Sequence, residues 1–269
     1  MAANAGSLRS ARQFGVINWL GVYTLYAKEV QRYLKIVGQT VFAPVVTSLL
    51  FLAVFSLALG RGAEVVSGTP YLVFLTPGLI VMAVMQNAFA NTSSSIIVAK
   101  IQGTVVDVLM PPLSPGELTF AFSMSSATRG LMVAIAVFLG MIIFVPLEFH
   151  DFGAVVFFTV AAAMLMSLVG LIVGIWAEKF DNIAFITNFV IMPLSFLSGT
   201  FYSIDRLPEI WQKVLHFNPF FYLIDGLRYG FIGHAESSLW VGVISLTTLN
   251  AILWATSYVL FLRGYKLKA

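Results

Sequence analysis

Residues 198–234 read SGTFYSIDRLPEIWQKVLHFNPFFYLIDGLRYGFIGH, and this stretch separates two of the most apolar segments of the chain. It carries acidic and basic residues, two prolines and nine aromatic residues. A stretch with this many charges does not cross a bilayer as one apolar helix, and an ordinary solvated loop does not contain so many aromatic residues. It is therefore an aromatic and polar interruption between segments that match a lipid environment.

The composition is that of an integral membrane protein. Of the 269 residues, 59% are hydrophobic and 10% are charged, and the mean hydropathy is +0.93, whereas soluble domains have about 45–50% apolar and about 25% charged residues. The net charge of +3 rests on few charged residues, so nucleic acid is not an expected partner. Because the chain has no cysteine, it has no disulfide, thiolate metal site or cysteine nucleophile.

Six apolar segments are long enough to cross roughly 30 Å of hydrocarbon. They cover residues 36–60, 71–95, 118–145, 154–176, 183–201 and 239–262. Pro193 predicts a kink or a short crossing in the fifth segment. The predicted fold is an all-α integral membrane protein with two parts: a tail with an amphipathic helix at residues 1–35, and a domain of six transmembrane helices at residues 36–269.

Six crossings place both termini on the same side of the membrane. The basic residues on that side are Arg9, Arg12, Lys28, Arg32, Lys35, Lys100, Lys179, Arg263, Lys266 and Lys268, and those on the other side are Arg61, Arg206, Lys213 and Arg228. This excess of lysine and arginine predicts cytoplasmic termini. The stretch at residues 198–234 is then expected on the outer face.

Residues 16–37 predict a basic amphipathic helix on the cytoplasmic leaflet. An aromatic and aliphatic stripe recurs at helical spacing, formed by Trp19, Tyr23, Tyr26, Val30, Tyr33 and Val37. Much of the rest is charged or polar, with Lys28, Glu29, Gln31, Arg32 and Lys35. Two interpretations stay open: the helix is an interfacial anchor, or it is a docking surface for a cytoplasmic partner.

Residues 203–234 predict two short helices that enter the outer leaflet and return. The first carries one apolar face, and Asn218 and Pro219 suit the N-cap and first position of the second. Each helix is roughly 15–20 Å long, which is about half a bilayer. Asp225 and Arg228 are expected opposite the apolar stripe of the second helix, where they can pair with each other as a structural latch.

Three stretches carry a resemblance to ATP-binding-cassette (ABC) permeases of type 2. Residues 191–230, IMPLSFLSGTFYSIDRLPEIWQKVLHFNPFFYLIDGLRYG, resemble the closing signature of that family. Residues 71–89, YLVFLTPGLIVMAVMQNAF, resemble its second span, and residues 103–118, GTVVDVLMPPLSPGEL, resemble the cytoplasmic segment that follows. The TRGL motif at residues 128–131 is similar to the NodJ and YadH-like branch.

The resemblance implies a homodimer of this chain with two ABC ATP-binding subunits, in the bacterial inner membrane and in contact with its lipids. The chain has no G-x-x-x-x-G-K-[ST] phosphate loop. We therefore predict that it is not an enzyme and binds no cofactor itself, and that ATP and Mg²⁺ bind to the partner subunit. Residues 100–117 are the expected coupling segment, with Gly103, Thr104, Asp107, Val108 and Leu109 as the contact residues.

Polar residues inside spans usually face a cavity or another helix. If spans two and five line the dimer cleft, as the resemblance implies, the candidates for the substrate pathway are Gln86, Asn87, Phe89, Asn91, Phe185, Thr187 and Asn188. The alternative is hydrogen bonding that fixes helix packing.

Arg129 lies inside the third span, where a charge needs a partner. The acids available are Glu117, Glu178 and Asp181, and a structural latch is favoured over a site for a substrate head group. The histidines share no metal-ligand spacing, and the chain offers no catalytic constellation, so neither a metal site nor a catalytic site is predicted.

The predicted function is the permease subunit of an ATP-driven exporter that moves an amphipathic, lipid-linked or saccharide-containing molecule outward. A multidrug-type efflux permease of the same family is the alternative. In other classes, an ion-driven secondary carrier and a membrane-embedded enzyme or scaffold remain, although no acidic residue lies in the middle of a span to bind a coupling ion.

Overall fold

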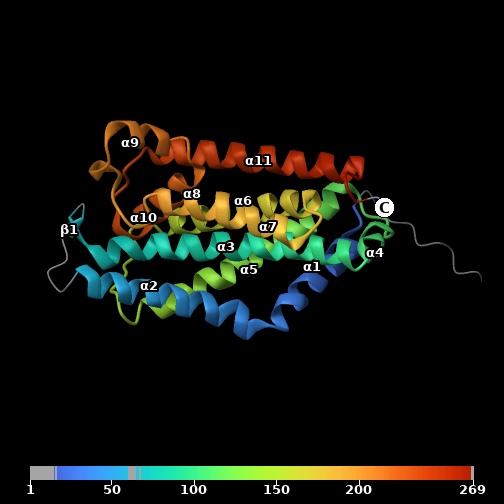
Figure 1. The fold of residues 1–269 in the computed structure, drawn as a ribbon, viewed down its shortest axis with the longest axis horizontal. Helices are drawn as coiled ribbons and strands as arrows, with labels where there is room; N and C mark the ends of the chain where they lie inside the picture. The colour runs from blue at the N-terminus through green and yellow to red at the C-terminus, as the bar shows by residue number, and fades with distance from the viewer. Residues whose placement is uncertain (1–14, 16, 60–64, 67, 268–269) are drawn as a thin grey trace, which may run out of the picture.

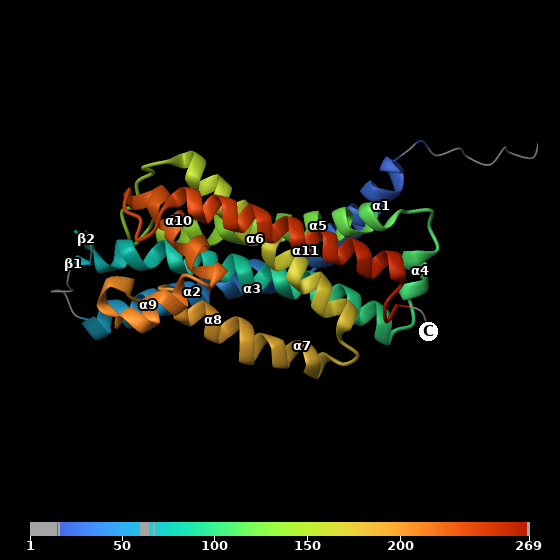
Figure 2. The ribbon, with the colours of Figure 1, turned by 90° about the horizontal axis from the view of Figure 1, so that it is seen from above.

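The structure is a computed structural model, and it describes residues 15, 17–59, 65–66 and 68–267. Of the predicted tail at residues 1–35, residues 1–14 and 16 lie outside this part of the chain. Most of the long helices run along one long axis of the molecule (Figure 1). The turned view in Figure 2 shows the same arrangement, with α9 and the β1–β2 pair at one end of the bundle and α1, α4 and the last described residues at the other.

Most of the secondary-structure elements are helices. The elements are α1 (Trp19–Leu34), η1 (Gly38–Phe42), α2 (Ala43–Leu59), β1 (Val65–Val66), β2 (Thr69–Pro70), α3 (Tyr71–Ile101), α4 (Val105–Leu109), α5 (Pro115–Met141), α6 (Phe152–Trp176), α7 (Phe180–Ile186), η2 (Thr187–Ile191), α8 (Met192–Leu197), η3 (Ile204–Arg206), α9 (Glu209–Leu215), α10 (Pro219–Ile232) and α11 (Leu239–Arg263). The strands β1 and β2 pair antiparallel, with Val66 opposite Thr69.

Within the described residues, six helical segments are long and apolar enough to cross a membrane, which confirms the number predicted. They are Gly38–Leu57, Tyr71–Ile101, Pro115–Met141, Phe152–Trp176, Phe180–Leu197 and Leu239–Arg263. The second is 31 residues long, or about 46 Å at 1.5 Å per residue, so it exceeds the thickness of the hydrocarbon core. The sequence prediction ended this span at residue 95, but the helix continues to Ile101.

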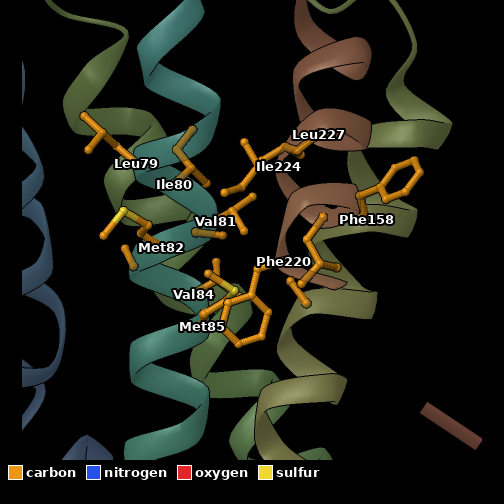
Figure 3. Close-up of a cluster of buried hydrophobic side chains, with 14 of the residues drawn as sticks. Leu79, Ile80, Val81, Met82, Val84, Met85, Phe158, Phe220, Ile224 and Leu227 are labelled. Carbon is orange, nitrogen blue, oxygen red and sulfur yellow. The ribbon is translucent and has the colours of Figure 1, made fainter. Parts of the chain in front are cut away.

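Helix α3 is the centre of the protein. Of its apolar window, 78% is buried, compared with 17% for the first span and 11% for the fifth and sixth. Figure 3 shows Ile80 and Val81 of α3 opposite Ile224 and Leu227 of α10. Because a transmembrane helix surrounded by protein is shielded from lipid on most sides, α3 is the element against which the other helices are positioned.

Two pairs of glycines allow helices to approach closely. Gly170 and Gly174 of α6 face α3, and a Cβ atom at Gly170 would lie 2.5 Å from the carbonyl oxygen of Phe89. The sequence GxxxG at these positions therefore serves packing, as is common in membranes. A second pair, Gly226 and Gly230 in α10, meets Phe158 and Val155 of α6 in the same manner.

Each of two prolines inside a span follows a π-helical segment. Segment η1 precedes Pro44, and η2 precedes Pro193. A proline in a helix lacks the N–H donor and its ring collides with the carbonyl group four residues earlier. A π-helical turn at that point relaxes the collision without ending the helix. At Pro193 the structure thus gives the predicted irregularity a definite form.

Residues 203–234 contain a 3₁₀ turn and two helices, α9 with 7 residues and α10 with 14; α9 is thus shorter than predicted. The side chain of Asn218 accepts a hydrogen bond from the backbone N–H of Phe220 at 3.1 Å, and Pro219 is the first residue of α10. The expected polar face of α10 is absent: Asp225 and Arg228 are 1% and 0% exposed. The reason is that α10 packs against α3, α6 and α11 rather than lying on the surface.

Candidate functional site

The N-terminus of α1 is fastened to the segment that precedes α5. Glu117 accepts a hydrogen bond from the backbone N–H of Asn18 at 2.5 Å and another from that of Ser114 at 2.6 Å. Ser114 in turn accepts one from the N–H of Glu117, which completes a capping box. The Asn18 side chain donates to the carbonyl oxygen of Pro112 at 3.2 Å. Helix α1 and residues 100–117 are therefore joined at one end of the bundle.

We expect Glu117→Ala to detach the start of α1. Two backbone N–H groups would lose their acceptor, which costs roughly 1–3 kcal/mol of local stability. Faster amide hydrogen exchange in residues 18–25 and 114–118 would report this. Glu148→Ala, which alters an exposed carboxylate at the other end, is the control and should leave exchange in these segments unchanged. Unaltered exchange in Glu117→Ala would contradict the anchoring role.

The buried face of α1 differs from the predicted stripe. The buried residues are Val22, Leu25, Glu29 and Tyr33, whereas Trp19 and Tyr23 are 66% and 67% exposed. The stripe was assigned for a helix lying on a bilayer, but α1 packs against α5, so the side facing α5 is buried instead. Glu29 is tolerated there because Arg32 pairs with it at 3.0 Å. Burial also raises the pKa of Tyr33 to about 12.

The predicted coupling residues lie around α4, at the same end. Gly103 has a φ of 71°, which allows the sharp turn before the helix. Thr104 and Asp107 are exposed, Leu109 is half-buried and Val108 packs into a small core with Val22 and Leu25. The surface near Asp107 also carries apolar side chains, namely Ile101, Val106 and Met110.

A groove of about 300 Å³ separates α1 from α4. Its lining includes Leu20, Thr24 and Lys28 from α1, and Asp107 and Pro111 from the coupling segment. We call this groove and the exposed residues of α4 the α4 docking surface. Apolar groups beside a few charges are typical of surfaces that bind another protein.

The candidates for the substrate pathway on α3 have different environments. Gln86 and Asn87 are half-buried, and both line a cavity of about 390 Å³ between η1, α2, α3 and α5. Asn91 is fully buried, and its side chain donates to Ser126 at 2.8 Å. Phe89 is 2% exposed, and its backbone meets Gly170. The structure thus places Gln86 and Asn87 on a cavity and the other two within the packing.

The fifth-span candidates do not line this cavity. Phe185 is 56% exposed and its ring lies 4.9 Å from that of Phe189. Thr187 donates a hydrogen bond to the carbonyl oxygen of Ile183 at 2.9 Å, and Asn188 is exposed. Within one chain the structure therefore does not bring the fifth-span residues together with Gln86 and Asn87.

Arg129 has amide partners instead of the expected acid. Its Nη1 atom donates to the side-chain oxygen of Asn91 at 3.3 Å and its Nη2 atom to that of Asn87 at 3.1 Å. Over the described residues, it forms no ion pair with Glu117, Glu178 or Asp181, so that prediction was wrong. The physical reason is that Glu117 is engaged by the start of α1, and Glu178 binds Lys266 at 2.6 Å.

Arg228 and Asp225 also have separate partners. Arg228 donates to the carbonyl oxygen of Gly199 at 2.7 Å, and its guanidinium lies 3.6 Å from the centre of the Phe74 ring. Asp225 accepts from the backbone N–H groups of Glu236 and Ser237 at 2.8 and 3.0 Å. The described residues contain no ion pair between Asp225 and Arg228. The prediction that the two side chains pair with each other was wrong. Although they lie one turn apart on α10, each binds backbone groups of another segment instead.

Basic side chains cap the end of α6 that faces α4. Lys100 donates to the carbonyl oxygens of Ile175 and Ala177 at 2.8 and 2.5 Å. Lys266 binds Glu178, and this hydrogen bond holds the pKa of Glu178 below its usual range. Cations at a helix C-terminus satisfy its free carbonyl groups. These contacts hold the C-terminal ends of α3 and α6 beside the coupling segment.

Sequence reasoning missed part of the cavity lining. Four polar residues of the first span face it: Gln39, Thr40, Thr47 and Ser48. Their spacing was a readable signal, because two adjacent polar pairs eight residues apart lie near the same face of a helix. Among the described residues, no cluster of three metal-ligating side chains occurs.

Within the described residues, six apolar helical segments, of which α3 is the most buried, define a polytopic membrane protein. The family model described as ABC-2 type transporter matches residues 21–232. The inner membrane transport permease YadH of Escherichia coli (strain K12) is 35% identical over 241 residues, which cover 88% of this chain and 94% of the relative. The chain therefore belongs to the ABC-2 type transporter family, and it is the permease subunit of a transporter.

Two more distant relatives share a different name. Nodulation protein J of Sinorhizobium fredii (strain NBRC 101917 / NGR234) is 26% identical over 219 residues, which cover 78% of this chain and 80% of the relative. Nodulation protein J of Rhizobium leguminosarum bv. viciae is 26% identical over 254 residues, which cover 90% of this chain and 94% of the relative. The predicted resemblance to the NodJ and YadH-like branch is thus confirmed.

Proposed function

We propose that this chain is the membrane subunit of an ATP-driven exporter of the bacterial inner membrane. It moves an amphipathic, lipid-linked or saccharide-containing molecule outward, and ATP is hydrolysed by a separate ABC subunit present in two copies. The single observation that carries this proposal is the joining of α1 to residues 100–117 through Glu117 and Asn18. A family permease without a phosphate loop needs a rigid surface to receive force, and this junction provides one.

The proposed orientation places the α4 docking surface in the cytoplasm. The excess of lysine and arginine on the side of the termini supports it. Residues 203–234 then lie at the outer end and act as a cap at the exit. The exposed side chains of α9 fit an outer leaflet, since Ile210 is 76% exposed and Trp211 is 50% exposed.

Two copies of the chain are proposed to form the pathway between them. The first and fifth spans expose much of their apolar surface in a single copy, with Leu57 83% and Phe189 69% exposed. Helix α3 is surrounded by its own chain. The contact between copies is therefore better assigned to elements near α2 and η2 than to α3, and the second span faces the pathway only through Gln86 and Asn87.

Asp107→Ala combined with Leu109→Ala is expected to uncouple the permease. Force reaches the span bundle through α4, so loss of these contacts leaves ATP hydrolysis by the partner without a conformational response. The readout is a single cysteine at Thr47, which lines the cavity; the natural chain has no cysteine to interfere. In the assembled complex, ATP should change the rate of maleimide labelling at this cysteine, and the double variant should abolish that change.

The matched control is Arg263→Ala combined with Tyr265→Ala. Both residues are exposed at the same end of the bundle but outside α4. The control should keep the response to ATP. A double variant at Asp107 and Leu109 that still responds to ATP would overturn the coupling role of this segment. Purification of the chain as an active transporter without any ATPase would overturn the proposed function.

A further inference from the structure

The cavity between η1, α2, α3 and α5 has a single charged residue in its lining. Its volume is about 390 Å³, and Arg129 is that residue. Ligand sites in proteins commonly have about 300–1,000 Å³. The cavity is therefore large enough for a small head group with part of an alkyl chain.

The charge of Arg129 is uncompensated inside the span. Its hydrogen bonds go to the neutral amide oxygens of Asn87 and Asn91. Its Nε atom is buried and has no hydrogen-bond partner among the residues that the structure describes. Arg32 lies nearby, but it is neutralised by Glu29 at 3.0 Å. A half-buried cation with no anion beside it is costly, and in a span it usually marks a functional site.

The lining has a polar part and an apolar part. Across the described chain, four lining residues make no side-chain hydrogen bond to protein, so their donors are free: Gln39, Thr47, Ser48 and Gln86. The apolar part is formed by Phe51, Leu79 and Met82. Figure 3 shows Leu79 and Met82 on the side of α3 that faces away from α10. Such a division matches a molecule with a polar head and an apolar tail.

We infer that this cavity binds the anionic head group of an amphipathic molecule, with the oxyanion on Arg129 and the alkyl chain against Phe51, Leu79 and Met82. Guanidinium groups bind phosphate and carboxylate oxygens through charge-assisted hydrogen bonds. The free amide and hydroxyl donors add contacts to the same head group. The binding is independent of ATP; that the bound molecule is cargo rests on the proposed function.

The test uses cysteine protection in the full chain, placed in phosphatidylcholine nanodiscs without the ATPase. Thr47→Cys reports on the cavity, and dodecyl phosphate is the probe. It should slow maleimide labelling, and Arg129→Gln should weaken this protection roughly ten-fold or more, because the charged hydrogen bonds are lost. Arg129→Lys keeps the charge and should retain most of the protection, which separates charge from folding.

Three comparisons make the result decisive. Dodecanol and dodecyltrimethylammonium have the same chain without an anion and should not protect; protection equal to that by dodecyl phosphate would overturn the inference. Inorganic phosphate protecting at the same concentration would overturn the role of the alkyl chain. A cysteine at Thr104, which is exposed outside the cavity, is the control. Its rate of maleimide labelling should be the same in every variant and with every probe.

One further probe distinguishes a membrane lipid from a transported molecule as the source of the head group. Phosphatidylglycerol that protects as strongly as dodecyl phosphate would assign the cavity to a membrane lipid and overturn its use for cargo. Weak protection by phosphatidylglycerol would support cargo. If the ATP response of the complex fails while dodecyl phosphate still protects, the proposed function is overturned and the anionic site stands.

Discussion

Arg228→Ala is expected to lower the stability of the purified protein by about 2–5 kcal/mol, the range for truncating a large side chain in a packed interior. Arg228 is 0% exposed, and it holds the carbonyl oxygen of Gly199 and the ring of Phe74. Alanine would leave this carbonyl without its donor and open a cavity between α10 and α3. It would also remove the positive charge that attracts the carboxylates of Glu236 and Asp225.

The measurement is the temperature at which the detergent-purified protein loses its monodisperse elution peak. Arg228→Lys keeps the charge but not the planar stack on Phe74, so it should fall between the wild type and Arg228→Ala. Arg263→Ala is the matched control, because Arg263 is exposed at the end of α11. Equal melting of Arg228→Ala and Arg263→Ala would show that the buried arginine does not hold residues 199–228 together.

Gly170→Ala should separate α6 from α3. An added Cβ atom would lie 2.5 Å from the Phe89 carbonyl oxygen and 3.1 Å from its Cα atom. Both neighbours are backbone atoms of the central helix, so no side chain can move aside. Overpacking of this kind costs about 1–3 kcal/mol, and more when the backbone must shift. Gly170→Leu should prevent isolation of a folded protein.

Gly116→Ala is the same change in a different environment. The nearest atom to a Cβ there belongs to the ring of Tyr258 at 3.7 Å, an ordinary contact distance. Its melting temperature should stay at or slightly above that of the wild type, because alanine has the higher helix propensity. The difference between the two alanine variants measures the tight packing of α3 on α6. Similar melting of both would contradict it.

Local patterns predicted the elements of this protein well. Six apolar stretches predicted six helical segments, and Asn218-Pro219 predicted the start of α10 to the residue. Both signals depend on neighbours in the chain: apolar length relative to bilayer thickness, and the chemistry of an N-cap. The capping box of Ser114 and Glu117 also has a local origin. The hydrogen bond by which Glu117 also holds the backbone N–H of Asn18 is a long-range contact.

The misassigned partners were all long-range. Arg129 was expected to find an acid, and Asp225 was expected to pair with Arg228. In each case the observed contact joins residues far apart in sequence, such as Arg129 with Asn91 or Arg228 with Gly199. The sequence showed that these groups need partners, but not which helix lies beside them.

The sequence by itself determined that the chain lies in a membrane, how many times it can cross, where residues 203–234 break and restart, and that no nucleotide loop is present. Length, hydropathy and capping are properties of contiguous residues, so they can be read along the chain. Only the tertiary structure decided that α3 is central, that the polar face of the first span meets Arg129 in a cavity, and that Arg228 holds Gly199. Those contacts depend on which helices pack together, and in a uniformly apolar solvent packing is set by the shapes of whole helix surfaces rather than by local pattern.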